Sequence, residues 1–201
     1  MRRLFFLVAT ATIITTGCNN NKKPGDVTIT DKDGKEKVTV NLNDMQSKAA
    51  EMEKKKEELA KLTPMSLEEL KALVPESIGG ATRSSYESNA SMGAVMVNAH
   101  YKIDDSTNVK VTIFDCAGNA GSSFYGLQYL TLFRGETDND REYSKTIDFN
   151  GGKGVMTCRK DRKDCTLVYS AGVSDRFLIT LDGNNVDGDG LKSFADKLNV
   201  K

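Results

Sequence analysis

Val95-Met96-Val97-Asn98-Ala99-His100-Tyr101-Lys102-Ile103, followed after a polar turn by Val109-Lys110-Val111-Thr112-Ile113, decides the fold of this chain. In both stretches apolar side chains occupy every second position, and mostly polar residues lie between them. This alternation predicts two β-strands that each bury one face. If the turn pairs Ile103 with Val109, all the apolar residues share that face, so we expect an antiparallel hairpin in this register.

The rest of the C-terminal region extends this pattern. Further strands are predicted at residues 143–149, 155–159, 165–171 and 177–181. Between the two groups of strands, Cys116 is followed by a glycine-rich loop and by residues 124–133, which are apolar on most of a helix circumference and therefore predict a buried helix.

Two shorter helices complete the region. Ser66 and Glu69 form a capping box that predicts a helix ending before Pro75. Near the C-terminus, an i, i+3, i+4, i+7 apolar stripe predicts an amphipathic helix; it consists of Leu191, Phe194, Ala195 and Leu198. Residues 63–201 are therefore expected to form one α+β domain, an antiparallel sheet with its helices packed on one face.

Residues 26–62 predict an appendage to this domain. Residues 26–40 predict a β-hairpin closed by Asp33-Gly34, with Ile29 opposite Val38. Residues 43–62 are highly charged with a thin apolar stripe, which favours an exposed spacer helix. A helix that pairs with a coiled-coil partner is the alternative.

Two cysteines flank a polar tip between predicted strands. A hairpin centred between Asp161 and Arg162 places Cys158 opposite Cys165 and Met156 beside Leu167, so the register that suits the apolar residues also suits a disulfide. Free thiols or a redox pair are the alternatives, although the spacing differs from C-x-x-C.

Cys116 and His100 are the remaining candidates for nucleophilic chemistry. Cys116 precedes Gly118 and a predicted helix, where a thiol pKa can fall. In the expected register His100 lies opposite Thr112, roughly 13 Å along the strand from Cys116, which is too far for a hydrogen bond. We therefore expect Cys116 to pack in the core and His100 to lie exposed on the polar side of the sheet, with no catalytic residues.

An acidic segment before the last helix is a weak candidate for a calcium loop. Its possible ligands are Asn185, Asp187, Asp189 and Asp196, which follow the calcium-loop pattern only partly. A turn followed by an Asp N-cap explains the same residues without a metal. We expect no metal and no cofactor.

Charge excludes one class of partner. Removal of residues 1–17 takes away Arg2 and Arg3 and leaves 26 basic against 28 acidic side chains, so a nucleic-acid-binding protein is not expected.

The N-terminus predicts export and a lipid anchor. Arg2 and Arg3 precede an apolar run at residues 4–14, which is too short to span a bilayer. Thr15-Thr16-Gly17-Cys18 resembles the lipobox of bacterial lipoproteins, although Thr15 stands where these usually have Leu. The resemblance implies a signal peptide at residues 1–17, acyl chains such as palmitate on Cys18, and a tether at residues 18–25. An ordinary secreted protein with Cys18 as a spare thiol is the alternative.

The globular region also carries a resemblance. Residues 67–75, 80–83, 101–115 and 176–182 are similar to a widespread group of bacterial envelope lipoproteins without assigned activity. This resemblance implies an envelope location and the same fold class, and it supplies no catalytic residue. Because Asn19, rather than Asp, follows Cys18, the outer membrane is the expected address, and the sequence indicates neither of its two faces.

These features together favour a non-catalytic binding or structural module held to the membrane by its N-terminal lipid, with an envelope protein as a possible type of partner. A periplasmic carrier of an apolar ligand is the alternative, since a sheet under helices can leave a cleft. An enzyme is the less favoured alternative.

The anchor can be tested directly. Cys18→Ser should leave the precursor unprocessed by the lipoprotein pathway and release any mature product from the membrane fraction, because the acyl chains supply the membrane affinity. The measurement is fractionation followed by immunoblotting. Partition of the variant with membranes after a high-salt wash would exclude lipid as the tether.

Overall fold

The structure is a computed structural model that describes residues 26–30, 37–91, 93–129, 136–198 and 200. The chain forms two compact units, residues 1–51 and 52–201. The predicted signal peptide, Cys18 and the predicted tether lie outside the described residues. Within the described ranges, no helix has the length and apolar character needed to cross a membrane.

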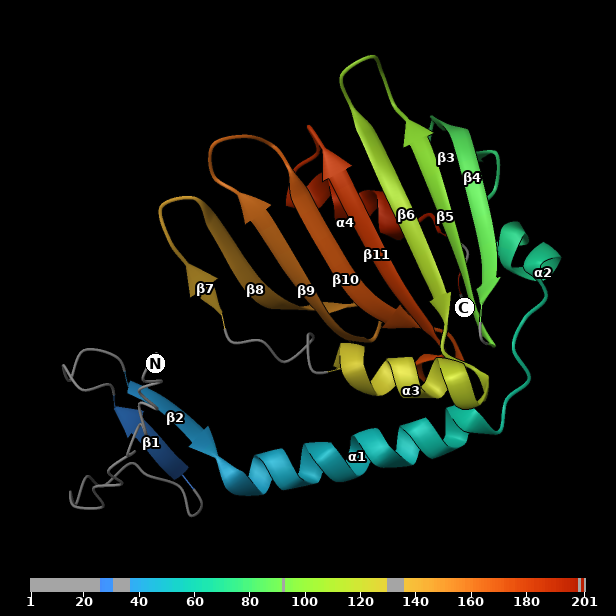
Figure 1. Ribbon diagram of the computed structural model, residues 1–201. Coiled ribbons are helices and arrows are strands. Elements are labelled where there is room, and N and C mark those ends of the chain that lie inside the picture. Colours follow the sequence, from blue (N-terminus) through green and yellow to red (C-terminus); the bar gives the residue numbers. More distant parts are fainter. Residues whose placement is uncertain (1–25, 31–36, 92, 130–135, 199, 201) are drawn as a thin grey trace, which may run out of the picture. The chain divides into compact units, whose positions relative to one another are not determined.

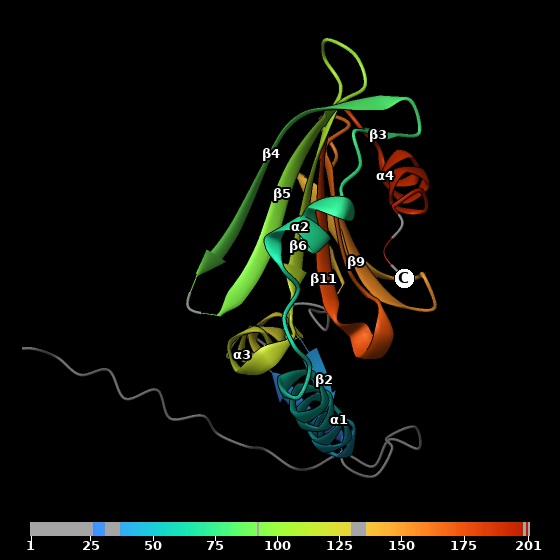
Figure 2. The same ribbon diagram turned by 90° about the vertical axis from the view of Figure 1, so that its right-hand side faces the viewer.

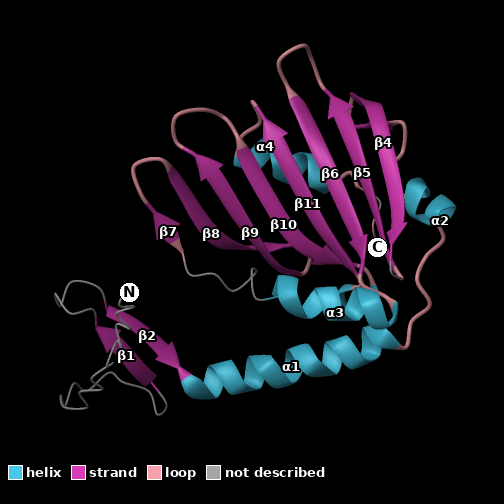
Figure 3. Cartoon of the chain, viewed as in Figure 1, coloured by secondary structure: helices cyan, strands magenta, loops and turns pink. Residues whose placement is uncertain are grey.

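The second unit is built on a nine-stranded antiparallel sheet, so the predicted α+β class is confirmed. The strand order is β3-β4-β5-β6-β11-β10-β9-β8-β7 (Figures 1 and 3). The strands are β3 (Ser77–Ile78), β4 (Ala81–Ser91), β5 (Ala94–Lys102), β6 (Asn108–Asp115), β7 (Thr137–Asp138), β8 (Glu142–Phe149), β9 (Gly152–Arg159), β10 (Cys165–Ala171) and β11 (Phe177–Asn184). A 3₁₀ turn, Val173–Asp175, joins β10 to β11.

The first unit contains β1 (Asp26–Thr30) and β2 (Lys37–Asn41), which pair antiparallel with Ile29 opposite Val38. The predicted turn at Asp33-Gly34 lies outside the described residues and stays a prediction. Helix α1 (Leu42–Ala60) begins in this unit and ends in the second one.

One face of the large sheet carries the main core. Helices α2 (Leu67–Ala72) and α4 (Gly188–Ala195) pack on this face through Leu70 and through Leu191 and Phe194, which are all buried. The Phe194 ring meets the Tyr101 ring edge-on, with centroids 5.4 Å apart. The capping box predicted for α2 is confirmed, since Ser66 accepts from the Glu69 N–H and Glu69 accepts from the Ser66 N–H.

The opposite face is also covered near one end, which corrects the expectation that all helices lie on one face. Helix α3 (Gly118–Tyr129) lies on the other side of the sheet from α4 (Figure 2). There Tyr125 and the α1 residue Leu59 are buried with Cys116 and Leu178. The last turns of α1 are therefore not the exposed spacer that the charge pattern predicts, because the thin apolar stripe ends in a fully buried Leu59.

The predicted β5–β6 hairpin exists, but its register is shifted by two residues. Tyr101, not Ile103, lies opposite Val109, and His100 lies opposite Lys110 instead of Thr112. Ile103 belongs to the turn, where its N–H donates to the Thr107 carbonyl. A shift of two residues keeps every side chain on its predicted face, so alternation alone does not distinguish the two registers.

Helix α3 begins six residues before the predicted start, inside the expected glycine-rich loop. A Cβ at Gly121 would lie 2.6 Å from the Cys116 carbonyl carbon, so glycine permits α3 to cross the backbone closely there. Phe124 is 45% exposed, so the expectation of a helix buried on most sides is wrong at this residue. Residues 130–133 of the predicted helix lie outside the described residues.

A buried ion pair connects the central strands to the chain that precedes α2. Asp115, at the end of β6, is fully buried and accepts from Arg176 Nε at 2.9 Å and Nη2 at 2.8 Å. The N–H groups of Met65 and Ala117 donate to the same carboxylate at 2.7 and 3.0 Å. Arg176 Nη2 also donates to the Thr63 carbonyl at 2.9 Å. The pair therefore fixes the connection between α1 and α2 to the sheet.

Burial by itself would raise the pKa of Asp115, but the Arg176 guanidinium and the N–H groups of Met65 and Ala117 outweigh it and hold that pKa below its usual value. A lowered pKa in the folded state means that the charged carboxylate contributes to stability above its unfolded pKa. This contribution is lost as the pH falls through the folded pKa.

Asp115→Asn should lower the free energy of unfolding by about 3–5 kcal/mol at neutral pH, because it leaves the partly buried Arg176 without its carboxylate. Chemical denaturation at several pH values measures the effect. The difference in the free energy of unfolding between wild type and variant should be largest above about pH 5 and should shrink below about pH 4. Asp105→Asn, at a fully exposed carboxylate paired with Lys102, is the control and should leave stability unchanged. Equal stability of both variants would contradict the role of the buried pair.

Candidate functional site

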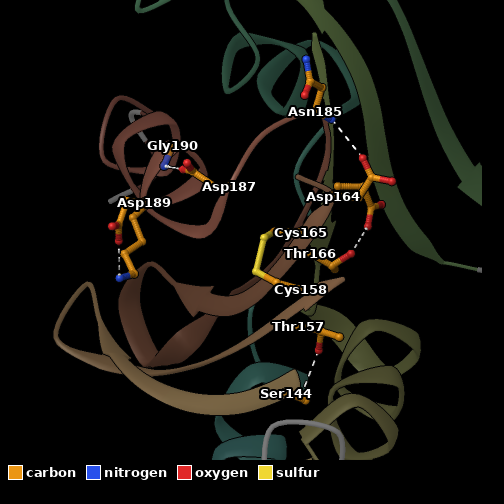
Figure 4. Close-up of a disulfide and its surroundings, with 12 residues drawn as sticks. Ser144, Thr157, Cys158, Asp164, Cys165, Thr166, Asn185, Asp187, Asp189 and Gly190 are labelled. Carbon is orange, nitrogen blue, oxygen red and sulfur yellow. Dashed lines mark hydrogen bonds and ion pairs between the residues drawn. A yellow bond between two sulfur atoms is a disulfide. The ribbon is translucent and has the colours of Figure 1, made fainter. Parts of the chain in front are cut away.

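The cysteines predicted to pair do so. Cys158 and Cys165 lie directly opposite on β9 and β10 and form a disulfide, with Met156 opposite Leu167 as expected (Figure 4). Their Cα atoms are 4.1 Å apart. Both cysteines are buried in the main core, and a Cβ on Gly188 of α4 would lie 3.6 Å from Cys158 Sγ. The disulfide thus joins a hairpin under the start of α4.

The two candidates for nucleophilic chemistry lie far apart. Cys116 is a free, fully buried cysteine, and burial together with the Asp115 carboxylate raises the pKa of its thiol to about 12. His100 is exposed, as expected, and lies opposite Lys110. Lys110 precedes Cys116 by six residues along the chain. At the usual strand rise this separation is roughly 20 Å. Cys116 is therefore a packing residue, and the two side chains do not form a catalytic pair.

The candidate calcium ligands each have a local structural role. Asp187 is the N-cap of α4 and accepts from the Gly190 N–H, while Asp196 is the C-cap residue. Asp189 forms an ion pair with Lys192 at 3.0 Å. Asn185 adopts a positive φ of 57°, and its N–H donates to Asp164.

Figure 4 shows Asn185 and Asp189 well apart, on different sides of the disulfide. Among the described residues, no group of three or more His, Cys, Asp or Glu side chains is placed to hold a metal ion. The N-cap and ion-pair interactions explain the acidic segment.

A hollow of about 250 Å³ lies beside the start of α4, against β8 and β9. Two lysines and two aspartates contribute to its lining, together with Tyr143, Met156 and Gly188; the charged residues are Lys145, Lys192, Asp187 and Asp189. Lys145 lies over the Tyr143 ring at 5.6 Å, and Lys192 is paired with Asp189. The charges balance within the hollow, which therefore does not resemble an apolar ligand cavity.

The sequence reasoning missed β4, an eleven-residue strand at the other edge of the sheet. Its outer side pairs with β3 only at Ala81 and Thr82. The strand is mostly exposed and rich in serine, so it shows no apolar alternation that could have predicted it.

The best-defined side-chain group on this edge surrounds Tyr86, which is 41% exposed. Lys71 Nζ of α2 lies 4.6 Å from the Tyr86 ring centroid, and Arg83 Cζ lies 4.9 Å from it. Arg83 also donates to the Val74 carbonyl. We call Lys71, Arg83 and Tyr86 the edge cluster.

Comparison of the chain with known protein families, with curated proteins and with solved structures finds no match.

The thiol chemistry gives a prediction. Non-reducing peptide mapping should find Cys158 joined to Cys165. In the Cys18→Ser variant, Cys116 is the one remaining thiol. It should react with an aromatic disulfide reagent only after unfolding, because it is buried and protonated. Reduction of the bridge should cost roughly 2.5 kcal/mol of stability. Rapid labelling of Cys116 in the folded protein would contradict its assignment as a packing residue.

Proposed function

We propose that this protein is a lipid-anchored protein of the bacterial envelope that acts as a non-catalytic binding module. The observation that carries the proposal is the exposed edge of β4, with the edge cluster beside it: a long surface of backbone groups and cationic side chains that lies open to a partner. The candidates for chemistry, by contrast, are dispersed, with Cys116 buried and His100 on the sheet surface.

The N-terminal region supports the location. The lipobox-like sequence at Cys18 and the predicted tether at residues 18–25 would attach the chain to the membrane ahead of the predicted hairpin. The buried disulfide is typical of an oxidising compartment such as the periplasm. Asn19 after Cys18 favours the outer membrane.

The alternatives have weaker support. A carrier of an apolar ligand needs an apolar cavity, whereas the hollow beside α4 is lined by balanced charges. An enzyme needs a nucleophile or a base that meets a partner, and the high pKa of Cys116 opposes that role.

The proposal is tested by photo-crosslinking in intact cells that express the full lipid-anchored chain. A benzophenone side chain is placed singly at the exposed positions Tyr86, Phe124 and Val173. A binding module should give one protein adduct of constant mass at one or more positions and a stoichiometric complex after mild detergent extraction. The absence of any adduct, with an apolar small molecule in the purified protein, would instead support the carrier.

A further inference from the structure

We propose that the outer edge of β4 binds an extended acidic segment of a partner protein, which adds to the large sheet as a further antiparallel or parallel strand. This inference rests on the proposed binding function and assigns its surface. It is argued from the backbone of β4, from the β-bulge within it and from the charges of the edge cluster.

The backbone of β4 provides the docking groups. Consecutive residues of a strand turn their N–H and C=O groups to alternate sides. Ser91 lies opposite Ala94 at the short connection between β4 and β5, so the backbone groups of Ser91 face β5. By this alternation Tyr86, Ser88 and Ala90 turn their backbone groups away from β5. In the described part of the chain, no strand pairs with that side of β4 beyond Thr82.

The composition of this edge does not prevent pairing. Natural edge strands are commonly protected by lysine, proline or inward-pointing charges. Residues 84–91 contain none of these three features: they include four serines, and their single charge, Glu87, lies opposite Asn98 on the other face of the sheet. A β-bulge can also protect an edge, but the bulge in β4 is confined to Ser84, so residues 86–91 form a regular strand. The opposite edge is different, because β8, which is covered by the two-residue strand β7 at one end only, carries Lys145 and Asp148.

A β-bulge creates the edge cluster. Arg83 pairs with Tyr101 and Ser85 pairs with His100, so Ser84 is an extra residue in β4. In a regular strand, positions 83 and 86 would point to opposite faces of the sheet. The extra residue instead places Arg83 and Tyr86 on the same face, opposite Tyr101 and Ala99, where Arg83 and Lys71 both reach the Tyr86 ring.

The charge of the cluster selects the partner. Neither Lys71 nor Arg83 forms an ion pair with a carboxylate of the described residues. A side chain opposite Tyr86 on an added strand would have its Cβ about 5 Å away, on the same face as the two cations. A glutamate or aspartate there would lie close to Lys71 and Arg83, which are both over the Tyr86 ring, so an acidic strand is favoured.

A second copy of this chain fits the edge less well. Two copies bring the same cations to the seam. In the antiparallel register that pairs residues 83–91 throughout, Glu87 would also lie opposite Glu87 of the other copy, and like charges in this position are destabilising. A separate acidic strand avoids both repulsions, because it brings carboxylates to the cations and need not place one opposite Glu87.

The test uses the full chain in detergent and two fluorescent seven-residue probes, Thr-Val-Thr-Glu-Thr-Val-Thr and the same peptide with Lys at its centre. Fluorescence anisotropy should show that the Glu probe binds at least tenfold more tightly than the Lys probe. Lys71→Glu should abolish this preference, because Lys71 is an exposed helix residue whose charge faces the edge and the new carboxylate would offset the charge of Arg83. Lys145→Glu is the matched control, since Lys145 also lies over a tyrosine ring but at the other edge, and it should preserve the preference.

Two further measurements separate strand addition from simple charge attraction. Glu probes that are N-methylated at either the odd or the even positions should differ, with one of them losing binding, because one set of N–H groups faces β4. Amide exchange at Tyr86, Ser88 and Ala90 should slow when the unmethylated Glu probe is bound. Binding that both methylated probes retain, or that Lys71→Glu leaves unchanged, would overturn the proposal.

The two proposals fail in distinguishable ways. A protein adduct in cells that Lys71→Glu does not weaken, with no preference for the Glu probe, would overturn the assignment of this edge and leave the binding function standing. Sedimentation that shows a dimer dissociated by Ser88→Pro, which removes an outward N–H of β4, would assign the edge to a second copy instead, and would likewise overturn the acidic-strand proposal.

Discussion

The buried pair of Asp115 and Arg176 is the constraint on which the arrangement of the second unit depends. Asp115 ends β6, Arg176 precedes β11, and these two strands lie side by side at the centre of the sheet. Through Thr63 and Met65 the pair also holds the chain that enters α2. A buried carboxylate with four donors has a high cost if any donor is lost, so the pair specifies one arrangement of these segments. The chain segments that lead into α2 on one face and α3 on the other are both hydrogen-bonded to this pair.

The sequence predicts the central strands well because each of them buries one face, and burial imposes alternation. The disulfide was predictable for a related reason: only one register places Cys158 opposite Cys165 while keeping Met156 beside Leu167. Three features were not predictable from alternation. The β5–β6 register differs from the expected one by two residues, which leaves the alternation unchanged, and β4 buries little of either face. The first turn of α3 depends on Gly121, which packs closely against the Cys116 backbone.

The edge cluster illustrates why a binding surface is harder to predict than a core. Lys71, Arg83 and Tyr86 are unremarkable in the sequence, and their proximity depends on one extra residue, Ser84, in β4. A bulge has no strong sequence pattern, and an exposed serine-rich strand reads as a loop. The candidates that the sequence did suggest, the acidic segment and Cys116, have structural roles in capping and packing.

The attachment of the chain at Thr63 and Met65 has a mechanical consequence. A pull along the chain from the N-terminal side of residue 63 would be transmitted through the Asp115 and Arg176 side chains to β6 and β11, which are central strands. Each of these strands is hydrogen-bonded to a neighbour on both sides, so no strand could be peeled away from an edge one hydrogen bond at a time. The load would be shared by several strands at once, which suits a domain that remains folded when it is pulled from its N-terminal side.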